Sequence, residues 1–381
     1  ERLPDVKLSG IRQQIGESPL FYESDSSLAY LRFQPGIQPG IDPALTDLST
    51  NYAAMRADSF HQVLLPKNFF GWLNVVPRVG ARVTQYGDTE GTQGTSFEDR
   101  TRFVFNTGAE VSTKASRVFR NAESSFWDVH ELRHIVEPSI NYVFVPGPNY
   151  RPNELPQFDT EIPSLRLLPI EFPDYNAIDS IDSQNVIRLT LFNKLQTKRE
   201  KEVQNLVNWG VYTDWRLNPR PDQTTFSDIY SDLDLRPRSW LSLSSQTRYS
   251  LDTHEWNASY NSATISPNST WSWQLGHFYF RGGPEFGPDS GNNTIFSRFY
   301  FKLNENWAVR FTHRFEARDG TLEEQYYTLY RDFRSWTGAL TFRVRDNRAQ
   351  GMDYAVAFTF QLKAFPFQHH DLNEHSFLLG S

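Results

Sequence analysis

Histidines and carboxylates are the residues of this chain that could carry acid–base or metal chemistry. Asp128, His134 and Glu137 lie close together in the sequence. A second set is spread further along the chain: Asp179, Asp182, His254 and Glu255. No HExxH, GxSxG or glycine-rich phosphate loop accompanies them, and the absence of cysteine excludes thiol catalysis, disulfides and cysteine-bound metals. The sequence therefore predicts no enzyme, no cofactor and no metal site.

The elements that must position these residues are strands, as the last clear run, Tyr354 to Lys363, illustrates. Successive side chains of a strand point to opposite faces, so this run places five large apolar side chains on one face and small or polar ones on the other. The apolar set is Tyr354, Val356, Phe358, Phe360 and Leu362. An uninterrupted pattern of about ten residues has the length of a strand that crosses an outer membrane. A half-buried strand of a soluble sheet is the alternative.

Composition narrows the class of protein. The chain has 381 residues, 15% aromatic residues and a mean hydropathy of −0.57, which is typical of a barrel with a wet interior and aromatic girdles. No run of about 18 apolar residues could form a transmembrane helix, and no apolar segment opens the chain, so we expect a mature or truncated form. A net charge of −7 without a basic run argues against nucleic-acid binding.

Segments of the same alternating design recur along the chain. They begin with weak candidates at Val6–Gln14 and Leu20–Phe33 and number about seventeen. Five segments open on a tryptophan: Trp240, Trp256, Trp271, Trp307 and Trp336. Tryptophan at strand ends suits the headgroup region of a bilayer, whereas cross-strand packing is the alternative explanation.

Long and short loops alternate along the chain, so that the long loops fall at one end of the predicted strands and the short loops at the other. If the last strand runs toward the periplasm, odd-numbered connections counted back from the C-terminus are external and even-numbered ones are periplasmic. The external set contains the long loops: Gln34–Thr50, Gly87–Arg100, Pro146–Asp182 and Gly282–Asn293. The periplasmic set contains the short ones: Pro66–Gly71, Pro237–Ser239, Pro267–Ser269, Asn304–Glu305 and Asp332–Ser335. Phe119–His130 is a medium-length exception to this sorting.

A soluble sandwich gives no reason for loops to sort in this way. The sequence therefore predicts an all-β fold, a large antiparallel transmembrane β-barrel of the outer-membrane type. The barrel is expected to span residues 1–364, with one long, proline-rich external loop at 146–182 and a C-terminal tail at 365–381. Strands resume after the proline-rich loop, so it is not a linker between domains. His369 and His370 fall in the tail and not in a metal site.

Several stretches resemble a known family. The first four are Gly71–Tyr86, Leu132–Tyr142, Asp179–Leu189 and Asn193–Lys198. Near the C-terminus the similar stretches are Leu303–Trp307, Asp319–Gly320, Glu323–Tyr330, Trp336 and Ala355–Ala364. In this order and spacing, over nearly the whole chain, they resemble the LPS-assembly family LptD, also called the organic-solvent-tolerance family. Each stretch alone is only moderately specific.

The resemblance implies a kidney-shaped barrel of about two dozen strands in the bacterial outer membrane. Such a barrel inserts lipopolysaccharide into the outer leaflet through a lateral seam between its first and last strands. The implied partners are an LptE-type lipoprotein plug, an LptA-type periplasmic bridge reached through a jelly-roll domain absent from this chain, outer-membrane lipid and the barrel-assembly machinery. An odd number of strands would be missing upstream. Many relatives carry a cysteine pair near Asp332–Trp336, and without cysteine that disulfide control cannot operate within this chain.

By the same resemblance, the final strand with its five apolar residues is the seam strand and the assembly signal. Seven arginines fall on the polar phase of their strands: Arg78, Arg82, Arg298, Arg310, Arg314, Arg343 and Arg345. Their guanidinium groups could meet the phosphates and core sugars of lipopolysaccharide. Pairing with luminal aspartate and glutamate is the alternative for each arginine. A passive porin or solute channel is the alternative function.

Overall fold

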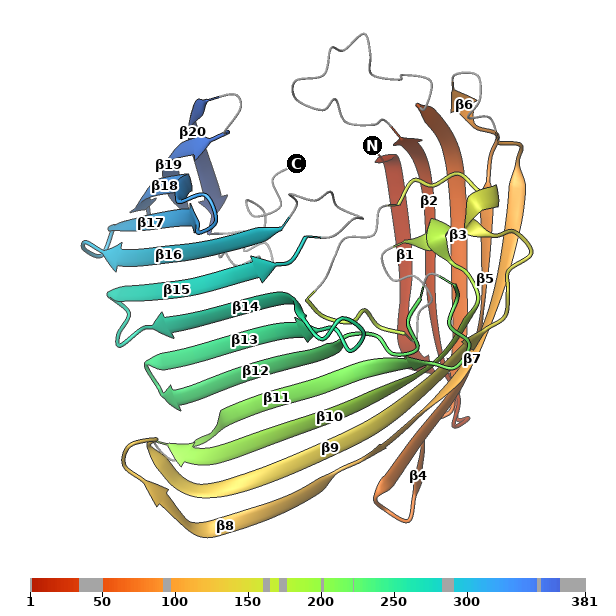
Figure 1. The fold of residues 1–381 in the computed structure, drawn as a ribbon, viewed down its shortest axis with the longest axis horizontal. Helices are drawn as coiled ribbons and strands as arrows, with labels where there is room; N and C mark the ends of the chain where they lie inside the picture. The colour runs from red at the N-terminus through yellow and green to blue at the C-terminus, as the bar shows by residue number, and fades with distance from the viewer. Residues whose placement is uncertain are drawn as a thin grey trace.

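The computed structural model describes residues 2–33, 51–91, 97–159, 165–170, 177–199, 202–221, 223–282, 291–347 and 351–363. Twenty strands in these ranges form one sheet, and every pairing is antiparallel. Figure 1 shows this sheet as one strongly curved surface. The predicted all-β, antiparallel fold is confirmed. In the described ranges no helix has the length and hydropathy needed to cross a bilayer.

The strands differ in length between the two halves of the sheet. Those of the first half have 13 to 17 residues: β1 (Arg2–Gln14), β2 (Phe21–Phe33), β3 (Tyr52–Leu64), β5 (Leu73–Tyr86), β7 (Arg100–Thr113), β9 (Val129–Val145), β10 (Gln184–Arg199) and β11 (Glu202–Arg216). Those of the second half have 9 to 12: β12 (Ile229–Arg238), β13 (Leu241–Tyr249), β14 (Trp256–Ile265), β15 (Trp271–Phe280), β16 (Asn292–Lys302), β17 (Trp307–Glu316), β18 (Thr321–Asp332), β19 (Trp336–Asp346) and β20 (Met352–Leu362). A strand of about 9 to 11 residues, tilted, spans a bilayer, so the second half has this length and the first half exceeds it.

Three further strands are β4 (Lys67–Phe69), β6 (Glu90–Gly91) and β8 (Ala115–Ser124). The sequence predicts one strand over Arg102–Val118 and then a loop at Phe119–His130, and this prediction is wrong. The chain leaves β7 at Thr113 because its partner β5 begins at Leu73, opposite Thr113. It continues as β8, paired with β9, and only residues 125–128 form the turn. The exception to the short-loop pattern therefore disappears. If β4 and β6 are left out and β7 and β8 are counted as one strand, the twenty strands become the seventeen expected.

Burial along the strands is the reverse of that in a soluble sheet. In β5, Arg78 and Arg82 are buried, whereas Val79 and Val83 are 45% and 43% exposed. β7 repeats this arrangement, with buried Arg102 and exposed Phe103. Polar side chains inside and apolar side chains outside are the pattern of an outer-membrane barrel.

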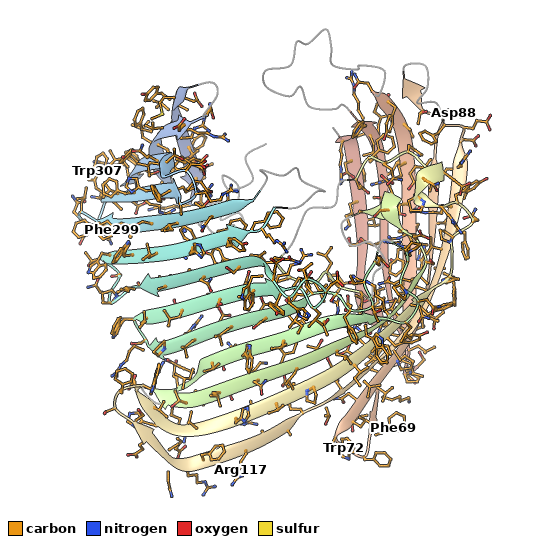
Figure 2. All side chains as sticks on the ribbon, viewed as in Figure 1. Phe69, Trp72, Asp88, Arg117, Phe299 and Trp307 are labelled. Carbon is orange, nitrogen blue, oxygen red and sulfur yellow. The ribbon has the colours of Figure 1, made fainter. Side chains whose placement is uncertain are left out.

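Tryptophans gather where the strands of the second half are joined by short turns, at what we call the short-turn end. Trp271, Trp307 and Trp336 are the first residues of β15, β17 and β19. Trp307 projects from the outer side of the sheet, and Trp72 lies near the tip of the β4–β5 hairpin (Figure 2). The guanidinium carbon of Arg331 lies 4.3 Å from the Trp307 ring centroid. These rings suit a headgroup layer.

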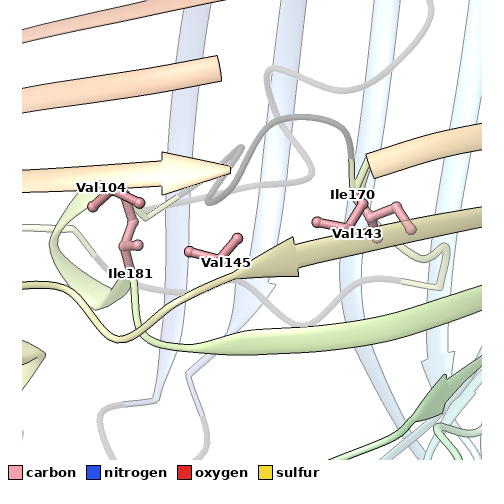
Figure 3. Packing of buried hydrophobic residues seen from close by; sticks show 5 residues of the cluster. All are labelled: Val104, Val143, Val145, Ile170 and Ile181. Carbon is pink, nitrogen blue, oxygen red and sulfur yellow. The ribbon is translucent and has the colours of Figure 1, made fainter. Parts of the chain in front are cut away.

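The long proline-rich region folds back onto the inner face of the sheet. Ile170 and Ile181 of this region pack against Val104, Val143 and Val145 of β7 and β9 (Figure 3). The described residues of the region include two short 3-10 helices, Pro152–Glu154 and Ile178–Ser180. The predicted loop Gln34–Thr50, most of Gly282–Asn293 and the tail with His369 and His370 lie outside the described residues.

β1 and β20 are the two edges of the described sheet. β1 pairs with β2 and β20 pairs with β19, and among the described residues no ladder joins β1 to β20. Figure 1 shows the two strands at opposite ends of the curve.

Candidate functional site

The register of the strands defines one continuous inner face, which we call the concave face. Paired residues of neighbouring strands share a face of the sheet. The successive strand pairings therefore place Arg78 of β5 and Arg314 of β17 on the same face as buried Val143 of β9. All seven predicted arginines lie on the concave face: Arg78, Arg82, Arg298, Arg310, Arg314, Arg343 and Arg345. The five apolar residues of β20 lie on the opposite, convex face and are 45% to 70% exposed.

The concave face of β3, β5, β7 and β9, together with the loop segments on it, forms what we call the packed wall. At its centre the Asp179 side chain is fully buried. One carboxylate oxygen accepts hydrogen bonds from Arg56 Nη1 and the Tyr86 hydroxyl, each at 2.7 Å. The other accepts from the backbone N–H groups of Phe158 and Asp159, at 2.7 and 3.0 Å. A buried carboxylate with four donors fixes the loop to the sheet.

A second arginine strengthens this attachment. Arg102 of β7, also fully buried, donates to the backbone carbonyls of Ile178 at 2.5 Å and Asp179 at 3.1 Å. Arg56 donates to Asp159 Oδ2 at 2.7 Å as well. Two arginines of the sheet thus hold two aspartates of the loop. Sequence reasoning identified Asp179 only as an acid–base candidate and missed Arg56 and Arg102. The alternation in β7 could have indicated Arg102, because it falls on the same face as the polar Asn106.

Arg78 and Arg82 belong to the packed wall and are 5% and 6% exposed. Arg78 Nη2 donates to Asn141 Oδ1 at 2.6 Å. Arg82 Nε lies 3.7 Å from Asp58 Oδ2, and its guanidinium carbon lies 4.9 Å from the Phe60 ring centroid. In this conformation both arginines are covered and contribute to the packing of the wall.

The concave face of β12 to β20 forms what we call the open wall, where most side chains are half-exposed. Glu324 lies 3.0 Å from Arg314 and 3.6 Å from Arg345, and Asp353 lies 2.6 Å from Arg343. Pairing with luminal carboxylates therefore occurs at these three arginines.

The other two predicted arginines of the open wall, Arg298 and Arg310, have different neighbours. Arg298 Nη1 donates to Gln274 Oε1 at 2.7 Å. The guanidinium carbon of Arg310 lies 6.0 and 5.4 Å from the ring centroids of Tyr300 and Tyr330.

The acid–base candidates are not brought together. His134 and Glu137 lie on opposite faces of β9, because their positions in the strand differ by three, an odd number. Glu137 is paired with Lys114 at 2.7 Å. Asp128 lies in the turn before β9.

The remaining candidates are equally dispersed. Asp182 lies 3.4 Å from Arg220, and Glu255 is paired with Arg281. His254 adopts a left-handed backbone conformation, with φ of 58°. Within the residues that the structure describes, no group of three or more histidine or acidic side chains could hold a metal ion.

A curved antiparallel sheet with a polar concave face, an apolar convex face and strands long enough to cross a bilayer defines an outer-membrane β-barrel protein. The family model described as LPS transport system D, LptD, matches residues 1–309, and the chain belongs to this family. It is therefore a protein of the bacterial outer membrane, and its family is one of lipopolysaccharide-transport proteins and not of enzymes.

Several solved structures are similar to this chain at low sequence identity. A triple mutant of the Rh. blastica porin is 10% identical with a TM-score of 0.31, over 90% of this chain and 99% of the porin. The ferric preacinetobactin receptor BauA from Acinetobacter baumannii is 12% identical with a TM-score of 0.41, over 94% of this chain and 65% of the receptor. P. aeruginosa FpvA, in a complex with an iron-loaded pyoverdine, is 8% identical with a TM-score of 0.30, over 93% of this chain and 62% of FpvA. No curated protein matches the chain.

Proposed function

We propose that this protein inserts lipopolysaccharide into the outer leaflet through a lateral seam at β20. The observation that carries the proposal is the edge position of β20, which among the described residues pairs only with β19. The outer edge of such a strand presents backbone N–H and C=O groups that can pair with another strand or separate from it.

The side chains of β20 suit the passage of an amphipathic lipid. Its concave face carries small residues, among them Ala355, Ala357 and Thr359, and its convex face carries Val356 and Phe358. A lipid that leaves across this edge keeps its phosphorylated sugars on the polar side and its acyl chains on the apolar side. No charged group then has to enter the hydrocarbon layer, where it would be costly.

The partners follow from the same proposal. An LptE-type lipoprotein plug would contact the open wall, because the loop of this chain already covers the packed wall. An LptA-type bridge would deliver lipid through a periplasmic domain. The barrel-assembly machinery would recognise β20 as the C-terminal signal.

A disulfide across the seam tests the proposal. In the full-length protein, a cysteine at Ala355 or Ala357 would be cross-linked to a cysteine in the first barrel strand. We expect a folded barrel that no longer delivers lipopolysaccharide to the cell surface. The matched control is Thr341→Cys with Ala357→Cys, because these two residues are already paired between β19 and β20. Surface lipopolysaccharide at the uncrosslinked rate would show that no seam opens at β20.

A passive solute channel is the second candidate function, and the half-exposed polar side chains of the open wall favour it. The two functions differ in ligand chemistry. A channel passes small sugars in a liposome-swelling assay without any lipid partner, whereas an exporter binds acylated, phosphorylated lipid.

A further inference from the structure

A cavity of about 510 Å³ lies where the open wall meets the short-turn end, and we call it the basal cavity. Its side chains come from β16 to β19, from the adjoining turns and from Lys363, directly after β20. Tyr300, Lys302, Arg310, Tyr330 and Asp332 lie on the concave face with the open-wall arginines. The basal cavity therefore adjoins the edge strand on the polar side of the sheet.

Charge in the basal cavity is weighted toward cations. Lys302, Arg310 and Lys363 contribute three positive groups, against the carboxylates of Glu305 and Asp332. Asp332 is engaged within the cavity, because its Oδ1 lies 2.7 Å from Lys363 Nζ and accepts a hydrogen bond from the Thr337 hydroxyl at 2.9 Å. An anion entering the cavity thus meets the exposed ammonium of Lys302 and the guanidinium of Arg310.

Aromatic rings give the cavity a second chemical character. Arg310 lies between Tyr300 and Tyr330, with 6.0 and 5.4 Å from its guanidinium carbon to the ring centroids. Cation–π contact with two rings holds the planar guanidinium at the cavity wall. A guanidinium fork binds phosphate oxygens, and tyrosine offers both a ring face and a hydroxyl to a sugar.

We infer that the basal cavity binds the phosphorylated sugar headgroup of the transported lipid. This inference rests on the proposed function, because a lipid whose acyl chains leave over β20 must carry its headgroup along the concave face beside that strand. The volume of the basal cavity is within the range of about 300 to 1,000 Å³ that is typical of small-molecule sites. This is enough for a phosphorylated sugar but not for a whole lipopolysaccharide. The headgroup would thus be held by Lys302 and Arg310 before the lipid crosses the seam.

Photo-crosslinking in the full-length protein, with its co-purifying partners, tests the inference. Benzoylphenylalanine would replace Thr337, which lines the basal cavity, or Thr312, which lies on the concave face of β17 outside it. The probe is purified lipopolysaccharide, with and without its lipid phosphates. We expect labelling at position 337 that falls roughly tenfold in Arg310→Gln, the loss of one charge-assisted hydrogen bond, and that falls similarly without the phosphates.

Arg248→Gln is the matched control, because Arg248 also lies on the concave face against a tyrosine ring, at 5.5 Å from the Tyr230 centroid, but outside the basal cavity. We expect it to leave labelling at position 337 unchanged. Labelling at position 312 without labelling at 337 would overturn the headgroup site and leave lipid transport intact. Labelling at neither position would contradict the proposed function itself. Full competition by inorganic phosphate would make the cavity a phosphate site and overturn the lipid assignment.

Discussion

The packed wall and the open wall follow the same alternation of polar and apolar side chains but use their polar side chains differently. In the packed wall, Arg56 and Arg102 are buried against Asp159 and Asp179 of the chain's own loop. In the open wall, Arg343 and its neighbours form half-exposed ion pairs within the sheet. The comparison teaches that an inward-facing arginine in a barrel is either part of the scaffold or part of a surface for a ligand, depending on what covers it.

Strand length separates the two walls as well. The longest strands of the first half, β9 and β10, have 17 and 16 residues, while β12 to β20 have 9 to 12. At about 3.3 Å per residue, the longer strands extend beyond the hydrocarbon layer and carry the docked loop. The shorter strands have the length of the layer itself, so lipid can reach the convex face of β20.

The largest effect is expected at the centre of the packed wall. Asp179→Ala would remove one of the two carboxylates that Arg56 contacts and leave the buried Tyr86 hydroxyl without its acceptor, and breaking comparable buried pairs costs about 3 to 5 kcal/mol. The free energy of unfolding, from urea titration in detergent micelles, measures it. Asp182→Ala is the control, since its partner Arg220 is partly exposed, and we expect a far smaller loss. Equal losses would mean that the loop is not held by Asp179.

The next effect concerns the two faces of β20. Phe358→Arg would place a charge toward lipid near the middle of the strand and should destabilise the barrel by about 2 to 4 kcal/mol. The neighbouring Thr359→Arg faces the concave side and should cost much less. Unfolding titrations and the amount of folded protein in the outer membrane provide the comparison. Similar tolerance at both positions would contradict the assignment of the convex face to lipid.

The smallest effect is expected in the open wall. Arg343→Gln removes an ion pair whose side chains are 32% and 41% exposed, and such pairs contribute about 0.5 kcal/mol. Unfolding titration should barely distinguish this variant from the parent. A loss as large as that of Asp179→Ala would show that the open wall is also scaffold, and the distinction between the walls would have to be abandoned.

The alternation of polar and apolar residues predicts the strands of the second half of the sheet well, because each of these strands can be recognised from its own residues alone. Trp256 and Trp307, which are predicted to open strands, are the first residues of β14 and β17. The break between β7 and β8 could not be predicted, since it depends on where the partner strand β5 begins. The Asp179 attachment was also out of reach, because its partner Arg56 is 123 residues away and only the path of the loop brings them together.

That separation in sequence has a consequence for the order of folding. The hairpins of β12 to β20 join strands that follow one another directly in the sequence. In contrast, Asp179 lies 123 positions from Arg56 and 93 positions from Tyr86. Contacts between distant residues form slowly, because the intervening chain must first lose its conformational freedom. The C-terminal hairpins, beginning with β19 and β20, should therefore form early, and the attachment of the loop should be among the last steps to complete the native barrel.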